Sequence, residues 1–268
     1  MRDDETMNVM VNDIAIYYET RGTGDDIVLI HGSPDNASLW IHKLTGLSTD
    51  YRVTAYDMRG FGRTPFGNAE YTSSQHASDL KGLIETLCIN RSVIVGYSMG
   101  GWTATHFATA HPSKVRALVL TGCSGGIGKP LPDSKQRSRE VTELLGKGDI
   151  AAIAEMQASR CFSPGFKERN PSEYLRYRDI KASNSIESLA RLMGSGRGYT
   201  NPLPFEQIAC PTLFIAGEYD AVAPLPVLKQ AQLLTPNSRL VVLPAGHASM
   251  LEMPEEFNKA IADFIKSL

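Results

Sequence analysis

The sequence GYSMG at residues 96–100 has the pattern G-x-S-x-G, in which the serine hydroxyl can act as a nucleophile. It follows the apolar run 92–95 and precedes the segment 99–110, which is predicted to be a helix. At such a junction, glycine on either side lets strand and helix pack closely, and the turn raises the hydroxyl to the carboxyl edge of the sheet. This context predicts Ser98 as a nucleophile; the alternative is a plain helix start with serine near its N-cap.

A histidine and a carboxylate would complete this chemistry, because serine needs a base to take its proton and the base needs an acid to hold its tautomer. In hydrolases with this serine motif, the acid and then the histidine follow the serine in the chain. His247, in the loop sequence PAGHASM, is the only histidine after residue 111. Asp220 and Glu218 both follow the apolar run 212–216. We favour Asp220, because it lies farther along a loop that has to reach the histidine.

The loop after the apolar run 27–30 offers a backbone donor for the oxyanion that forms when serine attacks a carbonyl. Its sequence is HGSP at residues 31–34. Proline has no N–H, so Ser33 is the better donor on this loop, and Met99 at the start of a helix is the second. The alternative is a simple strand-to-helix loop. His31 could mimic a base, but it precedes the serine in the chain.

Short apolar runs alternate with helix-length segments, and this alternation predicts the elements that position these residues. The segments expected to form strands are 13–20, 27–30, 53–56, 92–95, 117–120, 212–216 and 240–243. Those expected to form helices are 74–88, 99–110, 226–234 and 254–267. Strands joined through helices run parallel, so we expect an α/β protein with a mostly parallel sheet and helices on both faces.

The stretch 124–200 interrupts this alternation. It is rich in Lys, Arg, Glu and Ser and contains only weak helical segments, at 141–145 and 150–160. A piece of fewer than about 80 residues would have a marginal core alone, so we expect a small helical cap on one core formed by 1–123 and 201–268. Its larger apolar side chains either face a substrate or bury the cap on the sheet, and for each we favour burial: Met156, Phe162, Phe166, Tyr174, Tyr177 and Met193.

The composition is ordinary for a globular protein, with 42% hydrophobic and 21% charged residues. A net charge of -2 argues against general binding to nucleic acid or acidic membranes. The N-terminus lacks the apolar run of a signal peptide, and no segment approaches the roughly 20 apolar residues of a membrane span, so a cytoplasmic protein is expected. The cysteines are too scattered for a disulfide framework or a zinc site, so no metal is expected: Cys88, Cys123, Cys161 and Cys210.

Taken together, these motifs resemble the α/β-hydrolase superfamily. The matching segments, in chain order, are HGSP at 31–34, DMRGFGRT at 57–64, GYSMGG at 96–101, GEYDAVAP at 217–224 and GHASMLEMPEEF at 246–257. The resemblance implies an eight-stranded, mostly parallel sheet with a helical cap after the sixth strand. It implies Ser98, Asp220 and His247 as a catalytic triad and the N–H groups of Ser33 and Met99 as an oxyanion hole. It assigns the segment 57–64 a supporting role without chemistry of its own.

Departures from related families narrow the expected reaction. Epoxide hydrolases and haloalkane dehalogenases of this fold use aspartate at the position of Ser98, so the resemblance excludes their alkyl-enzyme chemistry. Carbon–carbon bond hydrolases commonly place tryptophan after the histidine and a Gly-rich loop after the first buried strand, whereas this chain has Ala248 and HGSPDNA at 31–37. The compact cap is similar to those of enol-lactonases and small carboxylesterases. Pro34, directly after the expected oxyanion residue Ser33, resembles the proline at this position in perhydrolase-type esterases. Peracid formation is therefore a side activity to test.

The sequence thus predicts a serine hydrolase that cleaves an ester or lactone of a small molecule through an acyl-enzyme, without a cofactor. Two alternatives stay open. One is a carbon–carbon bond hydrolase acting on a dienone or β-diketone, and the other is a non-catalytic receptor that holds a small ligand. The identity of the substrate and the oligomeric state, a homo-oligomer included, are also left open.

Overall fold

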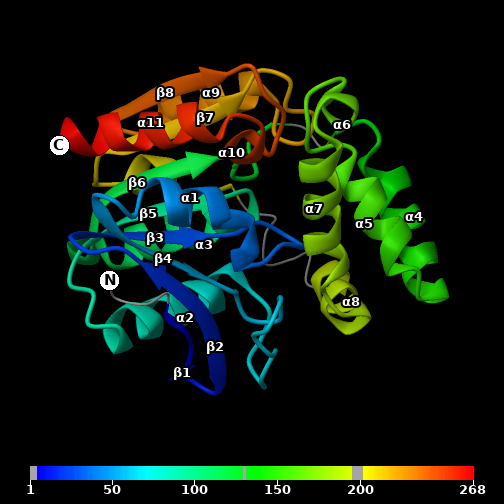
Figure 1. Ribbon diagram of the computed structural model, residues 1–268, viewed down its shortest axis with the longest axis horizontal. Helices are drawn as coiled ribbons and strands as arrows, with labels where there is room; N and C mark the ends of the chain where they lie inside the picture. Colours follow the sequence, from blue (N-terminus) through cyan, green and yellow to red (C-terminus); the bar gives the residue numbers. More distant parts are fainter. Residues whose placement is uncertain (1–4, 129–130, 195–201) are drawn as a thin grey trace.

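The strands form one mixed sheet in the order β1-β2-β4-β3-β5-β6-β7-β8 (Figure 1). The computed structural model describes residues 5–128, 131–194 and 202–268. Within these residues the strands are β1 (Glu5–Val11), β2 (Ile14–Arg21), β3 (Asp25–Ile30), β4 (Tyr51–Tyr56), β5 (Ser92–Tyr97), β6 (Val115–Thr121), β7 (Thr212–Gly217) and β8 (Ser238–Leu243). Only the β1–β2 and β2–β4 pairings are antiparallel. The expected α/β fold with a mostly parallel, eight-stranded sheet is confirmed.

Helices cover both faces of the sheet, because alternate side chains of the central strands point to opposite sides. In β3, Ile27 and Leu29 belong to the core on one face, and Val28 and Ile30 to the core on the other. The first face is covered by α1 (Ile41–Gly46) and α11 (Pro254–Lys266), and the second by α2 (Ser73–Thr86), α3 (Met99–Ala110) and α9 (Leu225–Leu234). Both faces are therefore buried, as the continuous apolar runs predicted.

The helices between β6 and β7 form a separate layer, which we call the cap. In the described residues these are α4 (Ser134–Lys147), α5 (Ile150–Ala158), α6 (Phe166–Arg169), α7 (Pro171–Ala182) and α8 (Ile186–Gly194). Figure 1 shows the cap beyond the ends toward which the parallel strands point, with α7 beside the sheet. The chain division at 123/124 and 200/201 stays a prediction, and its second boundary lies outside the described residues.

Most of the large cap side chains serve packing, as the sequence favoured. The four aromatic ones are buried in the core on the α1 and α11 face: Phe162, Phe166, Tyr174 and Tyr177. Phe162 and Phe166 stack with ring centroids 4.4 Å apart. Met156 and Met193 instead line a cavity beneath the cap. For these two methionines the expectation of burial against the sheet was wrong.

Some elements gave too weak a pattern to be expected from sequence. β1 is an edge strand whose Met7 and Met10 are 43% and 65% exposed, so it has no buried apolar run. α1 spans only 6 residues, too few to show a helical period. α7 was not predicted as a helix either, although it begins with Pro171. Proline suits the first helical position, because the N–H that it lacks would have no acceptor there.

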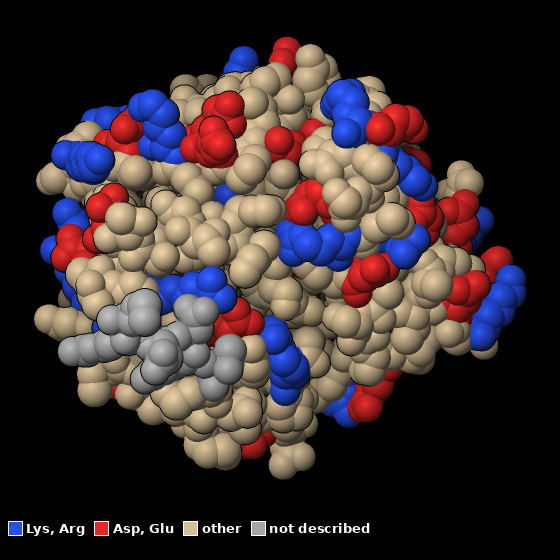
Figure 2. All heavy atoms as spheres, in the orientation of Figure 1, with Lys and Arg blue, Asp and Glu red and all other residues tan. Residues whose placement is uncertain are grey.

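The charge distribution, the helix lengths and the metal-ligating side chains narrow the kinds of site that the described residues can form. On the face drawn in Figure 2, basic and acidic side chains are interspersed. No helix in the described part of the chain is long and apolar enough to cross a membrane. The same residues hold no cluster of three or more His, Cys, Asp or Glu side chains that could bind a metal ion. All of the cysteines are described, and each carries a free thiol.

Candidate active site

Ser98 occupies a strained turn between β5 and α3. Its backbone has φ 51° and ψ −116°, which L-residues rarely adopt. The neighbouring glycines make this turn feasible: a Cβ at Gly96 would lie 2.6 Å from the carbonyl oxygen of Gly100, and one at Gly100 would lie 2.4 Å from that of Ile30. Met99 is the first residue of α3, so its N–H has no acceptor within the helix.

His247 and Asp220 approach each other from two loops at the same edge of the sheet. His247 Nδ1 lies 2.8 Å from Asp220 Oδ2, and both side chains are almost fully buried. The other carboxylate oxygen of Asp220 accepts hydrogen bonds from the backbone N–H groups of Val222 and Ala223, each at 2.7 Å. Glu218, the competing acid, is exposed to solvent. The structure therefore pairs the histidine with Asp220.

Ser33, Ser98 and His247 line one cavity of about 300 Å³ between the cap and the sheet edge. Ser98 and Met99 also line an adjoining hollow with Gly122. A Cβ at Gly122 would lie 2.7 Å from His247 Cε1, so only glycine lets this loop pass the imidazole. The structure thus brings together the residues that the sequence singled out, with Ser33 and Met99 bordering Ser98.

The loop that carries Ser33 rests on the segment 57–64. His31 Nε2 accepts a hydrogen bond from the Met58 N–H at 2.9 Å, which leaves Nδ1 to donate to the Gly32 carbonyl at 2.6 Å. Asp57 accepts from the Ala37 N–H at 2.7 Å. Burial lowers the pKa of His31. This histidine is a neutral support for the loop.

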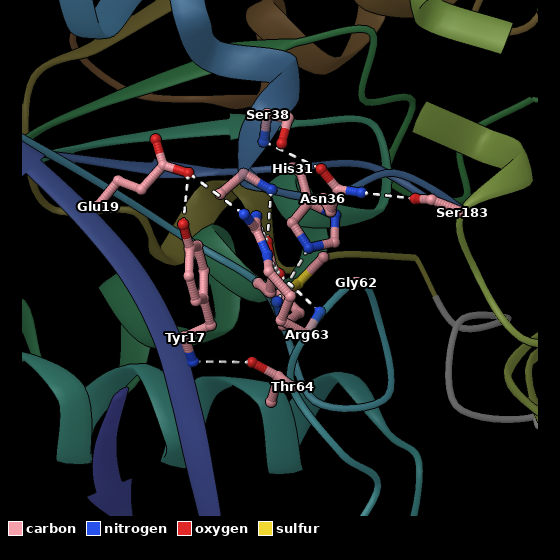
Figure 3. Close-up of polar contacts among 12 residues, drawn as sticks. Tyr17, Glu19, His31, Asn36, Ser38, Gly62, Arg63, Thr64 and Ser183 are labelled. Carbon is pink, nitrogen blue, oxygen red and sulfur yellow. Dashed lines mark hydrogen bonds and ion pairs between the residues drawn. The ribbon is translucent and has the colours of Figure 1, made fainter. Parts of the chain in front are cut away.

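The C-terminal end of α7 holds the same loop from the cap side. Asn184 Nδ2 donates to the Pro34 carbonyl at 3.1 Å, and its Oδ1 accepts from the Gly62 N–H at 3.0 Å. Figure 3 shows Asn36 reaching Ser183, whose hydroxyl accepts a hydrogen bond at 3.0 Å. Sequence reasoning missed these contacts, because they join residues more than a hundred positions apart.

A buried ion pair adds to this connection. Lys181 Nζ, on α7, lies 2.9 Å from Asp35 Oδ1, and both side chains are about 98% buried or more. Removing one partner of such a pair strongly destabilises the folded protein, because the other partner is left as an uncompensated buried charge. The cap and the loop that carries Ser33 are therefore held in one arrangement.

The His247 loop also contacts the cap. The Ala248 N–H donates to the Cys161 carbonyl at 2.7 Å, and Glu252 accepts from the backbone N–H groups of Ser163 and Gly246. A Cβ at Gly246 would lie 2.5 Å from the Phe162 carbonyl carbon, so the two backbones touch here. The cap thus touches both loops that flank Ser98.

The cavity that contains Ser98 is also lined by cationic side chains, which sequence reasoning did not assign to the site. Arg137 on α4, Arg160 just after α5 and Lys181 line it, together with apolar side chains such as Met156. None of the described residues that line the cavity is acidic. A helix-face pattern could have paired Arg137 with Val141, which also lines the cavity, but nothing in the sequence places Arg160 beside them.

Comparison with known proteins agrees with this architecture. A family model described as the alpha/beta hydrolase family matches residues 27–260, most of the chain. The chain belongs to this family, and it is a hydrolase by its fold and its relatives.

Individual relatives cover almost the whole chain. It is 29% identical to a putative 2-succinyl-6-hydroxy-2,4-cyclohexadiene-1-carboxylate synthase of Bacillus subtilis, covering 98% of this chain and 99% of the relative. It is 28% identical to 3-oxoadipate enol-lactonase 2 of Acinetobacter baylyi, covering 95% and 94%. A solved structure of a thermophilic esterase from Thermogutta terrifontis superposes with a TM-score of 0.86 at 26% identity, covering 98% of both chains.

Proposed function

We propose that this protein is a serine hydrolase that cleaves a carboxylic ester or lactone of a small molecule through an acyl-enzyme. The observation that carries the proposal is the cavity that Ser98 and His247 both line, with Asp220 paired to Nδ1 of the imidazole at 2.8 Å. A serine in a strained turn, a paired histidine and two N–H donors form the constellation that acyl transfer needs.

In the proposed reaction, the Nδ1–H of His247 donates to Asp220, which leaves Nε2 free to accept the proton of Ser98. The Ser98 oxygen adds to the substrate carbonyl, and the N–H groups of Ser33 and Met99 stabilise the resulting oxyanion. The tetrahedral intermediate collapses, the C–O bond to the alcohol breaks, and His247 returns the proton to that alcohol. Water, deprotonated by His247, then adds to the carbonyl of the Ser98 ester; the C–O bond to Ser98 breaks, His247 returns the proton to the Ser98 oxygen, and the acid is released.

Two of the relatives support this choice of bond. One is named an enol-lactonase and one is titled an esterase, and in both names the bond acted on joins an acyl group to oxygen. The proposal needs no cofactor, because serine, histidine and two backbone donors supply every step. Peracid formation, in which hydrogen peroxide replaces water, is a side activity of the same acyl-enzyme.

Substitution of the nucleophile tests the proposal. Ser98→Ala should lower kcat for 4-nitrophenyl esters by more than about 1,000-fold and abolish labelling by a fluorophosphonate, because the acyl-enzyme cannot form. Ser113→Ala, at an exposed serine, is the matched control and should keep both. Circular dichroism should show both variants folded. Retained hydrolysis by folded Ser98→Ala would refute the assignment.

A substrate panel separates the two alternatives. Esters and lactones of graded size should be turned over, whereas a dienone from aromatic ring cleavage should not. Turnover of the dienone alone would establish carbon–carbon bond hydrolysis. Binding of panel compounds with no turnover of any would establish a receptor.

A further inference from the structure

The cavity has an uneven distribution of charge. Among the described residues that line it, the charged side chains are Arg137, Arg160 and Lys181, and none is acidic. Lys181 is neutralised by Asp35 at 2.9 Å. Among the described residues, the two arginines form ion pairs with one carboxylate between them: Asp133 Oδ2 lies 3.0 Å from Arg137 Nε and 3.3 Å from Arg160 Nη2. Two guanidinium groups sharing one carboxylate leave an excess of one positive charge.

Each arginine also has a buried donor that makes no hydrogen bond among the described residues, and on Arg137 it is Nε, which is ion-paired with Asp133 without hydrogen-bond geometry. Arg160 Nη1 is buried and has no hydrogen-bond partner among the described residues, while its Nη2 donates to the Ala221 carbonyl at 3.3 Å. A buried N–H of a charged group without an acceptor is costly, so such groups are normally paired. Each guanidinium thus lacks an acceptor for one donor in the cavity that it shares with Ser98.

We infer that the acyl part of the substrate carries a carboxylate, bound by Arg137 and Arg160 while the ester or lactone carbonyl lies at Ser98. This inference rests on the proposed function and specifies its substrate class. A carboxylate fits because it is planar, accepts from the fork of a guanidinium, and matches an excess of one positive charge. Met156, Val141 and Met193 supply an apolar lining for the hydrocarbon between the two groups.

Chain-matched substrates test the inference directly. The 4-nitrophenyl monoesters of succinic, glutaric and adipic acid carry a terminal carboxylate, and the 4-nitrophenyl esters of butyric, valeric and hexanoic acid are their neutral counterparts. We expect at least one monoester to exceed its neutral match in kcat/KM by about 10-fold or more, because its carboxylate adds a charge-assisted hydrogen bond to the arginines. Neutral esters preferred at every length would overturn the inference.

Arginine variants locate the effect. Arg137→Gln and Arg160→Gln should each lower kcat/KM for the best monoester by about 10- to 100-fold and change it for the neutral match by less than about 3-fold. Arg139→Gln is the matched control, because Arg139 is exposed on the same helix, α4, and does not line the cavity. Equal losses on both ester types would mean that the arginines only hold the cap together, and would refute the inference.

A binding measurement keeps the test independent of chemistry. Glutarate should competitively inhibit hydrolysis of the valerate ester by the wild-type protein, and inhibition should weaken by at least about 10-fold in the Arg137→Gln/Arg160→Gln double variant. Inhibition that is unchanged in this variant would contradict the site. Failure of the proposed function looks different, because folded Ser98→Ala would then hydrolyse the neutral esters as fast as the wild type.

Discussion

At the residue scale, the carboxylate of Asp220 is fixed more firmly than its partnership with His247 alone requires. One oxygen accepts from two backbone N–H groups at 2.7 Å, which directs the other oxygen toward His247 Nδ1 at 2.8 Å. An amide at this position would keep its oxygen on the two N–H groups and present its NH₂ to the imidazole. The geometry therefore specifies a carboxylate and not merely a polar group.

Asp220→Asn should consequently fold but hydrolyse poorly. The amide NH₂ would donate to Nδ1 and place the imidazole proton on Nε2. Nε2 could then not accept the proton of Ser98, so kcat should fall by about 10³- to 10⁴-fold. Steady-state kinetics on a 4-nitrophenyl ester and the melting temperature check this. Glu218→Gln, at the exposed neighbouring acid, should keep kcat within about twofold. The opposite ranking of the two variants would make Glu218 the acid.

At the element scale, the end of α7 acts on the loop that carries Ser33. Asn184 donates to the carbonyl of Pro34, the residue after Ser33, and accepts from the Gly62 N–H. The loop is thus held between the cap and the segment 57–64, and Figure 3 shows the neighbouring hydrogen bond from Asn36 to Ser183. An oxyanion donor is effective only when it is held in place before the reaction.

Asn184→Ala should therefore lower kcat by about 10-fold while KM changes by less than about 3-fold, because loosening the loop weakens an interaction made in the transition state. Asn258→Ala removes a comparable hydrogen bond, to the His42 carbonyl, in a part of the fold away from the cavity. It should lower the melting temperature without changing kcat. Equal kcat for both variants would show that α7 does not position the loop.

The contrast between Ser98 and Arg160 explains how much of the site was predictable. Ser98 sits on a strand–turn–helix junction whose sequence pattern is local, so its place at the sheet edge followed from neighbouring residues. The core strands were predicted for the same reason, since burial on both faces requires an unbroken apolar run. Arg160 reaches the cavity only through the packing of α5 against α4 and α7, and no local pattern encodes such packing.

At the scale of the whole molecule, buried polar groups on the α2 face connect segments that are far apart in the chain. Arg59, fully buried, donates to Asp79 on α2 at 2.7 and 2.8 Å and to Asp13, between β1 and β2, at 2.7 Å. His76, one helical turn before Asp79, is buried beside this network, with its ring 4.8 Å from that of Tyr71. Protonating that histidine would add a charge to a region with no water to stabilise it.

His76 should therefore make the folded state sensitive to acid. Burial, aided by His31 and Arg59 and opposed by Asp79, lowers its pKa from 6.5 to about 3. Well above pH 6.5 the imidazole is neutral in both the folded and the unfolded state, so it does not change the free energy of unfolding with pH. As the pH falls from there toward 3, the unfolded chain binds a proton that the folded protein does not bind, so the free energy of unfolding falls by up to about 1.4 kcal/mol per pH unit. His76→Asn, which cannot titrate, should lose correspondingly less between pH 6.5 and 5. Urea unfolding of both proteins across this range measures the difference in slope, and parallel curves would show that His76 takes up its proton without unfolding.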